Sequence, residues 1–340
     1  MPALDGANLL NSDSKPRVLF VDDEPALLDG LCRTVRREFA ADVATDADRG
    51  LDYLRSGRPY CIVVSDMRMP GMDGAEFLAT VRTISPDSVR VMLTGCDEIE
   101  IAMRAVNEGR IFKFLSKPVS SEVLLACLRT CLATYLDERA QTQRMTSTIR
   151  ALEQLDIATL TAFSRAIDAN SSWTAGHSER VTAVALRIAH AMGLPAKDLQ
   201  IVHRGGLLHD VGKIGTPSAI LDKPCKLEVW ENDIMRNHVK VGFRILEPID
   251  CFRDLLGVVA QHHEHYDGSG YPAGLAGEQI SLHARIVAVA DAYDALISDR
   301  PYRKGVPPGK AIEILKGKSG TQFDPKVLEA FLRVSPRLMR

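Results

Sequence analysis

Four short apolar runs in the first third of the chain each stop at polar residues, and this pattern constrains the fold more than any other feature. The runs are residues 18–21, 61–64, 91–94 and 111–115. Their length suits buried strands, and the helical spacing of apolar residues over 27–35, after Pro25, predicts a helix between the first two. Strands that alternate with helices predict an α/β doubly wound domain with a parallel sheet.

The polar residues at the ends of these runs predict a binding site. They are Asp22, Asp23, Asp66, Thr94 and Lys117. Because the carboxyl ends of parallel strands share one edge of a sheet, we expect these side chains to lie together. Carboxylates bind hard cations such as Mg²⁺, and a lysine can stabilise a phosphoryl group beside them. The alternative is four strand ends that are polar by chance.

This region resembles a response-regulator receiver domain. The matching segments are VDDE, VVSDMRMPGMDG, MLTG and FLSKP, in the order and spacing of that family. The resemblance implies a flavodoxin-like or CheY-like fold and phosphorylation of Asp66 by a cognate sensor histidine kinase. It also implies that Asp22 and Asp23 hold Mg²⁺ and that Thr94 and Lys117 contact the phosphoryl group.

A third segment, from Leu124 to Leu152, has apolar residues at steps of three and four, interrupted by Glu138 and Thr142. The spacing predicts one long helix. One interpretation is a parallel coiled coil that forms a homodimer and carries a twist or shift to the second domain. The other is an amphipathic helix packed on its own domain.

Composition sets the wider frame. A chain of 340 residues with 46% apolar and 25% charged residues can form two domains, and a net charge of −2 gives no general attraction to nucleic acid. No apolar run approaches the roughly 20 residues of a membrane span. With seven cysteines but no Cys-x-x-Cys pair and no basic leader, we expect a cytoplasmic protein with reduced thiols. We divide the chain into a disordered tail (1–15), a receiver domain (16–132), a helical linker (133–155) and a second domain (156–340).

The second domain holds all nine histidines, the first of which is His177. Its apolar spacing is helical throughout, and no series of strands is predicted, so we expect an all-α fold. Seven residues on these segments are candidate metal ligands: His177, His209, Asp210, His238, His262, His263 and Asp291. Imidazole and carboxylate ligands that turn inward from several helices can hold two neighbouring cations, which can hydrolyse a phosphodiester.

This domain resembles the HD-GYP subgroup of the HD phosphohydrolase superfamily. The matching segments are GHSERV, LLHDVGKIG, NHVKVGFRIL, HHEHYDGSGYP, ARIVAVADAYDAL, RPYR and GTQFDP. The resemblance implies a cyclic di-GMP phosphodiesterase controlled by the receiver. It implies that one metal is bound by His177, His209, Asp210 and Asp291, and that Asp210 bridges to a second metal bound by His238 and His262. His263 is the least certain ligand. Fe or Mn is favoured, with Ni and Zn as alternatives.

Other residues of the matching segments have implied roles around the substrate. Lys213, three residues after Asp210 and expected on the same helix, would place a positive charge at the scissile phosphate, so Asp210 and Lys213 are the catalytic candidates. Gly270 and Tyr271 would form a loop that contacts the substrate. Arg300 and Arg303 resemble the family's contacts to the second phosphate, which a guanidinium can hold through two hydrogen bonds.

Several points stay open. Residues 169–176 contain no carboxylate, whereas some members of the family have a Glu there that binds a third metal. We therefore expect two metals, and the linear product pGpG in preference to GMP.

Three further residues of this domain have expected supporting roles. His203 is expected in the core, and Glu264 is expected to orient the ligating imidazoles. Asp294 either orients them as well or is a charge on the helix surface. The alternatives in function are a weakly active signalling adaptor, with diguanylate cyclase domains among its partners, and a hydrolase of cyclic GMP-AMP.

Overall fold

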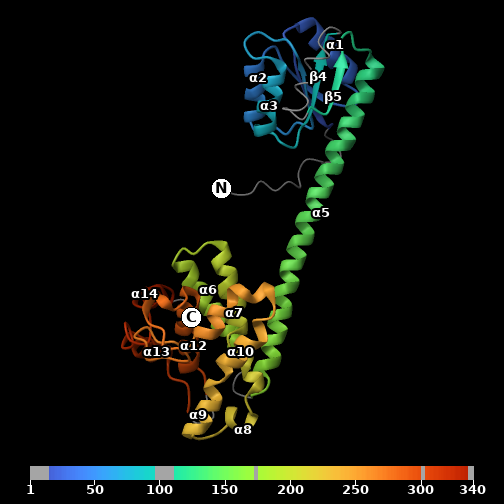
Figure 1. The fold of residues 1–340 in the computed structure, drawn as a ribbon. Coiled ribbons are helices and arrows are strands. Elements are labelled where there is room, and N and C mark those ends of the chain that lie inside the picture. The colour runs from blue at the N-terminus through green and yellow to red at the C-terminus, as the bar shows by residue number, and fades with distance from the viewer. Residues whose placement is uncertain (1–14, 96–110, 172–174, 300–302, 336–340) are drawn as a thin grey trace. The chain divides into compact units, whose positions relative to one another are not determined.

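The computed structural model describes residues 15–95, 111–171, 175–299 and 303–335. The chain forms two compact units, residues 1–149 and 150–340 (Figure 1). In the described residues, no helix is both long enough and apolar enough to cross a membrane. Residues 1–14 of the predicted tail (1–15) lie outside the described residues, as does Arg300.

The first unit contains a five-stranded parallel sheet in the order β2-β1-β3-β4-β5. The strands are β1 (Arg17–Val21), β2 (Ala40–Ala44), β3 (Ile62–Asp66), β4 (Val89–Thr94) and β5 (Lys113–Ser116). The helices in the described residues of this unit are α1 (Pro25–Val35), α2 (Ala47–Arg55), α3 (Gly74–Ile84) and the first part of α5 (Ser121–Asp168). The predicted doubly wound fold is confirmed.

Two apolar cores lie on the two faces of this sheet. On one face, Phe20 and Val64 pack with residues of α1 and α5. On the other face, Leu19 and Val63 pack with residues of α2 and α3. Because both faces are covered, the strand residues are apolar in unbroken runs, which is why the sequence shows them clearly.

Strand β2 was missed by the sequence analysis, which expected four strands. Its sequence is AADVA, and four of its five residues are only half-buried because it lies at one edge of the sheet. A short edge strand rich in alanine has neither a long apolar run nor strong β propensity. The pattern therefore gave no signal.

Helix α5 is 48 residues long, which confirms that the connector is helical. Leu124, Leu128 and Tyr135 pack on the receiver sheet, so this part follows the second interpretation, a helix packed on its own domain. The side chains of Ile149 and Leu152 are about half exposed or more, at 47% and 60%. The dimer seam stays a prediction for that segment.

The second unit is helical in its described residues, apart from isolated bridges. Its helices are α6 (His177–Ala191), α7 (Ala196–Leu208), η3 (Val211–Gly215), α8 (Ser218–Leu221), α9 (Val229–Arg236), α10 (His238–Leu246), η4 (Asp250–Leu255), α11 (Leu256–Gln261), η5 (Gly277–Gln279), α12 (Leu282–Ile297), α13 (Pro308–Lys316) and α14 (Pro325–Val334). The larger core joins α6, α7, α12, α13 and α14, and a smaller one joins the end of α5 to α7, α10 and α11.

Candidate functional site

All seven predicted metal ligands converge in the second unit from five separate segments. Two of them begin helices, His177 at the start of α6 and His238 at the start of α10. Asp291 lies within α12, and the pair His262 and His263 follows α11. His209 and Asp210 form the turn between α7 and η3, and so they lie at a helix end rather than within a helix as we expected. Ending helix α7 at this point lets both side chains turn into the centre.

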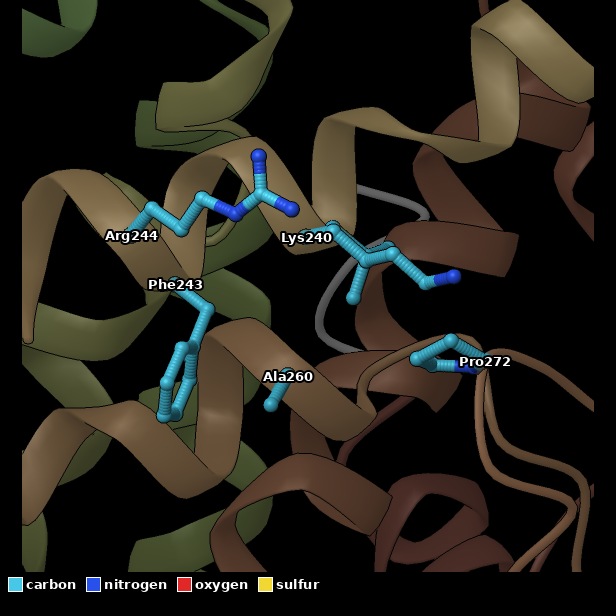
Figure 2. Close-up of a pocket in the computed structure, with 6 residues that line it drawn as sticks. Lys240, Phe243, Arg244, Ala260 and Pro272 are labelled. Atoms are coloured by element: carbon cyan, nitrogen blue, oxygen red, sulfur yellow. The ribbon is translucent and has the colours of Figure 1, made fainter.

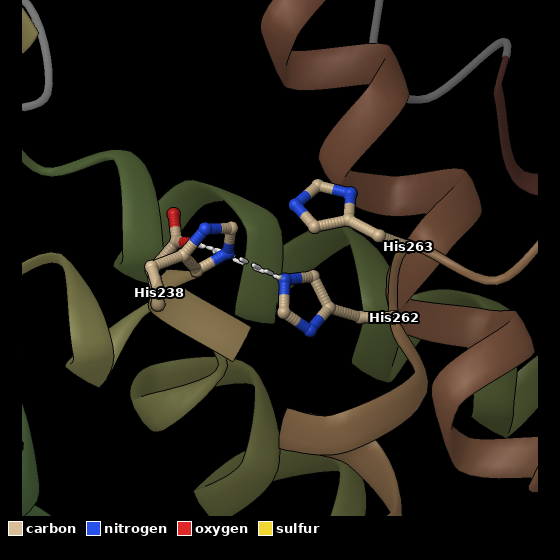
Figure 3. Close-up of side chains that lie close together, drawn as sticks. His238, His262 and His263 are labelled. Atoms are coloured by element: carbon tan, nitrogen blue, oxygen red, sulfur yellow. Dashed lines mark hydrogen bonds and ion pairs between the residues drawn. The ribbon is translucent and has the colours of Figure 1, made fainter. Parts of the chain in front are cut away.

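The seven side chains form two groups that could each hold an ion. His177, His209 and Asp291 make the first group, and their ligand atoms all lie within 4.8 Å of one another. In this group, His177 Nε2 lies 3.2 Å from Asp291 Oδ1. The second group consists of Asp210, His238, His262 and His263, with the same maximum spacing. Figure 3 shows the three imidazoles of the second group turned toward a common centre.

Asp210 lies between the two groups. Its Oδ2 is 3.6 Å from His177 Nε2 and 3.3 Å from His209 Nε2, while its Oδ1 is 3.3 Å from His238 Nε2 and 3.9 Å from His262 Nε2. One carboxylate oxygen therefore faces each group. This is the arrangement that a bridging carboxylate needs to bind two ions at once.

The orientation of the imidazoles fits metal binding. Nδ1 of His209, His238 and His262 lies 2.7, 2.6 and 3.0 Å from the carbonyl oxygens of Gly206, Met235 and Val259. Because a carbonyl oxygen can only accept, each Nδ1 must carry the proton, and Nε2 is left with a free lone pair that points inward.

Two buried atoms at the centre make no hydrogen bond within the part of the chain that the structure describes. They are His209 Nε2 and Asp210 Oδ1. In addition, Nε2 of His238 and Nε2 of His262 face each other at 3.4 Å, with no proton to share when both Nδ1 atoms are protonated. Buried lone pairs without a donor are costly unless a cation satisfies them. The residues present therefore fit a metal centre.

The pKa values of the group reflect the same mixture of burial and charge. Burial lowers the pKa of His263 to about 3 and that of His262 well below its ordinary value. Burial also opposes the charge on His177, but hydrogen bonds to Asp291 and Asp294 outweigh it and raise its pKa to about 9. The pKa of Asp291 is held well below its usual range, since His177 outweighs the effect of burial.

Asp294, whose role the sequence left open, orients a candidate ligand. Its Oδ2 accepts from His177 Nδ1 at 2.7 Å, and its Oδ1 accepts from Arg180 Nε at the same distance. Asp294 is buried, so the pair of donors is required to keep its charge in place. The sequence analysis missed Arg180, although it lies in the GHSERV segment, because nothing in the pattern assigned it a partner.

Asp168 was also missed, and it lies one residue before the stretch in which we searched for a third carboxylate. It is buried and accepts from both the backbone N–H and the hydroxyl of Ser178. These hydrogen bonds anchor the start of α6 next to His177, so Asp168 helps to fix the orientation of α6. Its carboxylate belongs to none of the three groups that could hold a metal in the described residues.

The candidate catalytic lysine lies beside the centre. Lys213 Nζ forms an ion pair with Asp210 Oδ2, from the short helix η3 rather than from a helix shared with Asp210. Arg303 donates to the carbonyl oxygens of Ala295 and Leu296, at the end of α12. Its contact to substrate therefore stays a prediction, and the partner residue Arg300 lies outside the described residues.

The predicted GYP loop, residues 268–272, lies against the centre. The Tyr271 ring stacks on His263 with centroids 4.8 Å apart and an interplanar angle of 23°. A Cβ at Gly270 would lie 2.2 Å from the backbone nitrogen of His265, so glycine is required there by the loop's own packing. This explains Gly270 without a ligand, and its contact to substrate stays a prediction.

Glu264 has a different role from the one we expected. Its carboxylate accepts from the backbone N–H groups of Ala273 and Leu275, at 2.7 and 3.1 Å. The Glu264 side chain is buried and thus anchors the chain just after the GYP loop. The Nδ1 atoms of the ligating imidazoles instead contact backbone carbonyls and, for His177, Asp294. A glutamate next to two histidines suggested the imidazoles as partners, but its side chain turns toward the loop.

The first unit contains the second predicted site, at the carboxyl edge of its sheet. Asp22, Asp23 and Asp66 form a group that could hold a cation. Lys117 Nζ lies 2.7 Å from Asp22 Oδ2 and 2.5 Å from Asp66 Oδ1. Burial opposes the charge on Lys117, but these two partners outweigh it and raise its pKa. Thr94 ends β4, and its hydroxyl lies 3.6 Å from the sulfur of Met67, next to Asp66. All five predicted residues therefore lie at the same edge.

Comparison with known proteins identifies a family for each of the two units. Residues 18–129 match the response regulator receiver domain family, and residues 161–327 match the HD domain family. The chain is similar to the cyclic di-GMP phosphodiesterase response regulator RpfG of Xanthomonas campestris, with 34% identity over 93% of this chain and 87% of that protein. It is also similar to a cyclic di-GMP phosphodiesterase of Thermotoga maritima, with 31% identity over 86% of this chain and 84% of that protein.

A further relative, 3'3'-cGAMP-specific phosphodiesterase 3 of Vibrio cholerae, is 42% identical over 50% of this chain and 37% of its own length. That match covers about half of this chain, whereas RpfG covers almost all of it. Taken with the receiver edge and the histidine-rich centre, these similarities show that the chain belongs to the RpfG-type family of response regulators, in which a receiver domain precedes an HD-GYP domain.

Proposed function

We propose that this protein is a metal-dependent phosphodiesterase that hydrolyses cyclic di-GMP to pGpG under the control of phosphorylation at Asp66. The observation that carries the proposal is the position of Asp210, with one carboxylate oxygen toward each of two imidazole groups. The names of the relatives that match most of the chain, both cyclic di-GMP phosphodiesterases, support the choice of substrate.

Two divalent ions, with Fe or Mn favoured, would be held by the two groups, and Asp210 would contact both. When bound, such a pair activates water and neutralises the phosphodiester oxygens during attack. Four of the five imidazoles are already turned inward, those of His209, His238 and His262 by a carbonyl and that of His177 by Asp294, so little reorganisation of these four is required. The donor set of imidazoles and carboxylates suits these metals.

The chain's own residues supply orientation and charge. Lys213 would place its ammonium at the scissile phosphate, where it can stabilise the charge that develops on the leaving oxygen. Tyr271, stacked on His263, would offer its hydroxyl and the edge of its ring to the substrate. Arg300 and Arg303 remain proposed contacts to the second phosphate.

The receiver would control this reaction. Its family implies a phosphodonor, for which we propose a cognate sensor histidine kinase, with Mg²⁺ held by Asp22 and Asp23 beside Asp66. We further propose that the exposed apolar residues of α5, including Ile149 and Leu152, form a homodimer seam. A change in that seam on phosphorylation could then reach the second unit.

Cyclic GMP-AMP is the second candidate substrate, because the cGAMP-specific relative is 42% identical over the half of the chain that it matches. Nothing in the described centre separates guanine from adenine. Product chromatography with each dinucleotide in turn decides between them.

The proposed function is tested with Asp210→Ala. We expect loss of turnover of cyclic di-GMP and loss of bound metal, with the helical content retained. Asp250→Ala is the matched control, since that carboxylate is 92% exposed on η4. Full activity of the Asp210 variant would contradict the proposal, and three firmly bound ions per chain would contradict the two-metal centre.

A further inference from the structure

A row of basic side chains leads away from Tyr271 along α9 and α10. Arg236 ends α9, and Lys240 and Arg244 follow on α10. Lys240 and Arg244 are four residues apart and therefore lie on the same side of α10. The guanidinium of Arg236 lies over the Tyr271 ring, 4.9 Å from its centroid. Arg236 was not a site residue in the sequence analysis.

The charges of this row are not neutralised within the described residues. None of the three head groups forms a hydrogen bond or an ion pair there, and Arg236 contacts only the Tyr271 ring. Like charges four residues apart on a helix repel each other. A row of this kind beside a candidate active site favours an anion that comes from outside the chain.

A small cavity begins where the GYP loop ends. It has a volume of about 210 Å³ and is lined by Val239, Lys240, Phe243, Arg244, Ala260 and Pro272. Figure 2 shows Lys240 and Arg244 on α10, with Pro272 of the loop nearby. Pro272 follows Tyr271 directly, so the cavity borders the residue that stacks on His263. Basic groups next to the apolar surface of Phe243 and Pro272 suit a nucleotide better than an inorganic anion.

A cyclic dinucleotide carries two phosphodiesters, and only one of them can lie at the metal centre. The second phosphodiester must be held away from the metal centre, by residues other than those that contact the first phosphodiester. Arg236 lies one ring away from the candidate ligand His263, with Tyr271 between them. In contrast, the Arg303 guanidinium donates hydrogen bonds to carbonyl oxygens at the end of α12. Arg236 therefore has donors free to supplement the proposed contact of Arg303, both of whose terminal nitrogens already donate to carbonyl oxygens.

We propose that Arg236, assisted by Lys240, binds the second phosphate of the cyclic dinucleotide. The inference rests on the proposed function and assigns its substrate two contacts that the family resemblance did not supply. A guanidinium can hold a phosphate through two parallel hydrogen bonds while its face stays on the Tyr271 ring. Arg236 would also keep Tyr271 in place once substrate is bound.

The test compares two substrates of the metal-loaded, full-length protein. For Arg236→Ala, we expect KM for cyclic di-GMP to rise about tenfold or more, as for loss of a charge-assisted hydrogen bond, with a smaller change in kcat. Bis(p-nitrophenyl) phosphate has a single phosphodiester, so its kcat/KM should fall less than threefold. Arg236→Lys should show an intermediate KM, because lysine keeps the charge but not the paired hydrogen bonds.

Graded and matched variants complete the experiment. The rise in KM for cyclic di-GMP should be largest for Arg236→Ala, smaller for Lys240→Ala and smallest for Arg244→Ala. Arg253→Ala, on exposed η4, is the control for loss of a positive charge. Equal losses on both substrates, or loss of metal from the Arg236 variant, would show a structural role and overturn the inference. If the wild type turns over cyclic di-GMP and the Arg236 variant keeps its KM, the inference alone fails. If the wild type turns over no cyclic dinucleotide, the proposed function fails and takes the inference with it.

Discussion

Asp294 offers the sharpest test of how the metal centre is built. Its carboxylate accepts from His177 Nδ1 at 2.7 Å and is itself paired with Arg180 at 2.7 Å. If Asp294 orients the imidazole, Asp294→Ala should weaken metal binding about 10- to 100-fold, which is typical for the loss of a carboxylate behind a ligating histidine. Each tenfold loss corresponds to about 1.4 kcal/mol of binding free energy.

The conservative variant separates orientation from charge. In Asp294→Asn the amide oxygen can still accept from Nδ1, so the imidazole keeps its orientation and loses only the polarising charge. We therefore expect a smaller loss of affinity, about tenfold at most. Asp299→Asn is the matched control, since Asp299 is half exposed near the same helix end and pairs with Lys304.

The measurement is a titration of metal-free protein with Mn²⁺ or Fe²⁺, followed by counting the ions that remain after desalting. We expect one ion to be lost from Asp294→Ala before the other, since His177 belongs to only one of the two groups. Unchanged affinity in both variants would refute the argument that Asp294 positions His177. Loss of both ions together with loss of helical content would point to damage to the fold instead.

Two further predictions follow from the pKa of His177 and from α5. The pKa of His177 in the metal-free protein is raised to about 9, so below that pH a metal ion must displace the His177 proton in order to bind. The affinity for metal should therefore rise from pH 6 to 8, by up to about tenfold per pH unit, and stop rising above about pH 9. Calorimetric titration across this range checks it, and a flat profile would contradict the raised pKa. Ile149→Glu with Leu152→Glu should shift sedimentation toward the monomer because it places charge in the proposed seam, whereas Ser147→Glu, on an exposed position, should not. A wild type that already sediments as a monomer would refute the seam.

The candidate ligands were predictable because metal binding requires particular side chains. Imidazole and carboxylate groups in a helical domain stand out against its apolar spacing, and all seven predicted ligands lie in the two groups. The receiver edge was predictable for a similar reason, since buried parallel strands give unbroken apolar runs that end in polar residues. Strand β2 lies at the sheet's edge, half-buried, and lacked this contrast.

The supporting residues could not be predicted in the same way, because their types are common and their partners lie far away in the chain. Asp294 and His177 are 117 residues apart, and the ion pair with Arg180 has no periodicity that would reveal it. The partners of Glu264 were predicted wrongly because, just after the end of a helix, neighbouring residues in the sequence can point their side chains in different directions. Its side chain turns to backbone donors 9 and 11 residues ahead.

The carbonyl contacts of the histidines explain why this centre is built at helix ends. His209 and His262 cap the ends of α7 and α11, where backbone carbonyls lack helical partners and can accept from Nδ1. His238 begins α10 and uses the carbonyl of Met235 near the end of α9 in the same way. Each helix terminus thus satisfies one of its own acceptors and fixes the imidazole with the same hydrogen bond. A substitution that extended α7 past His209 would remove both effects, so the turn at Asp210 is as much a part of the centre as the ligands.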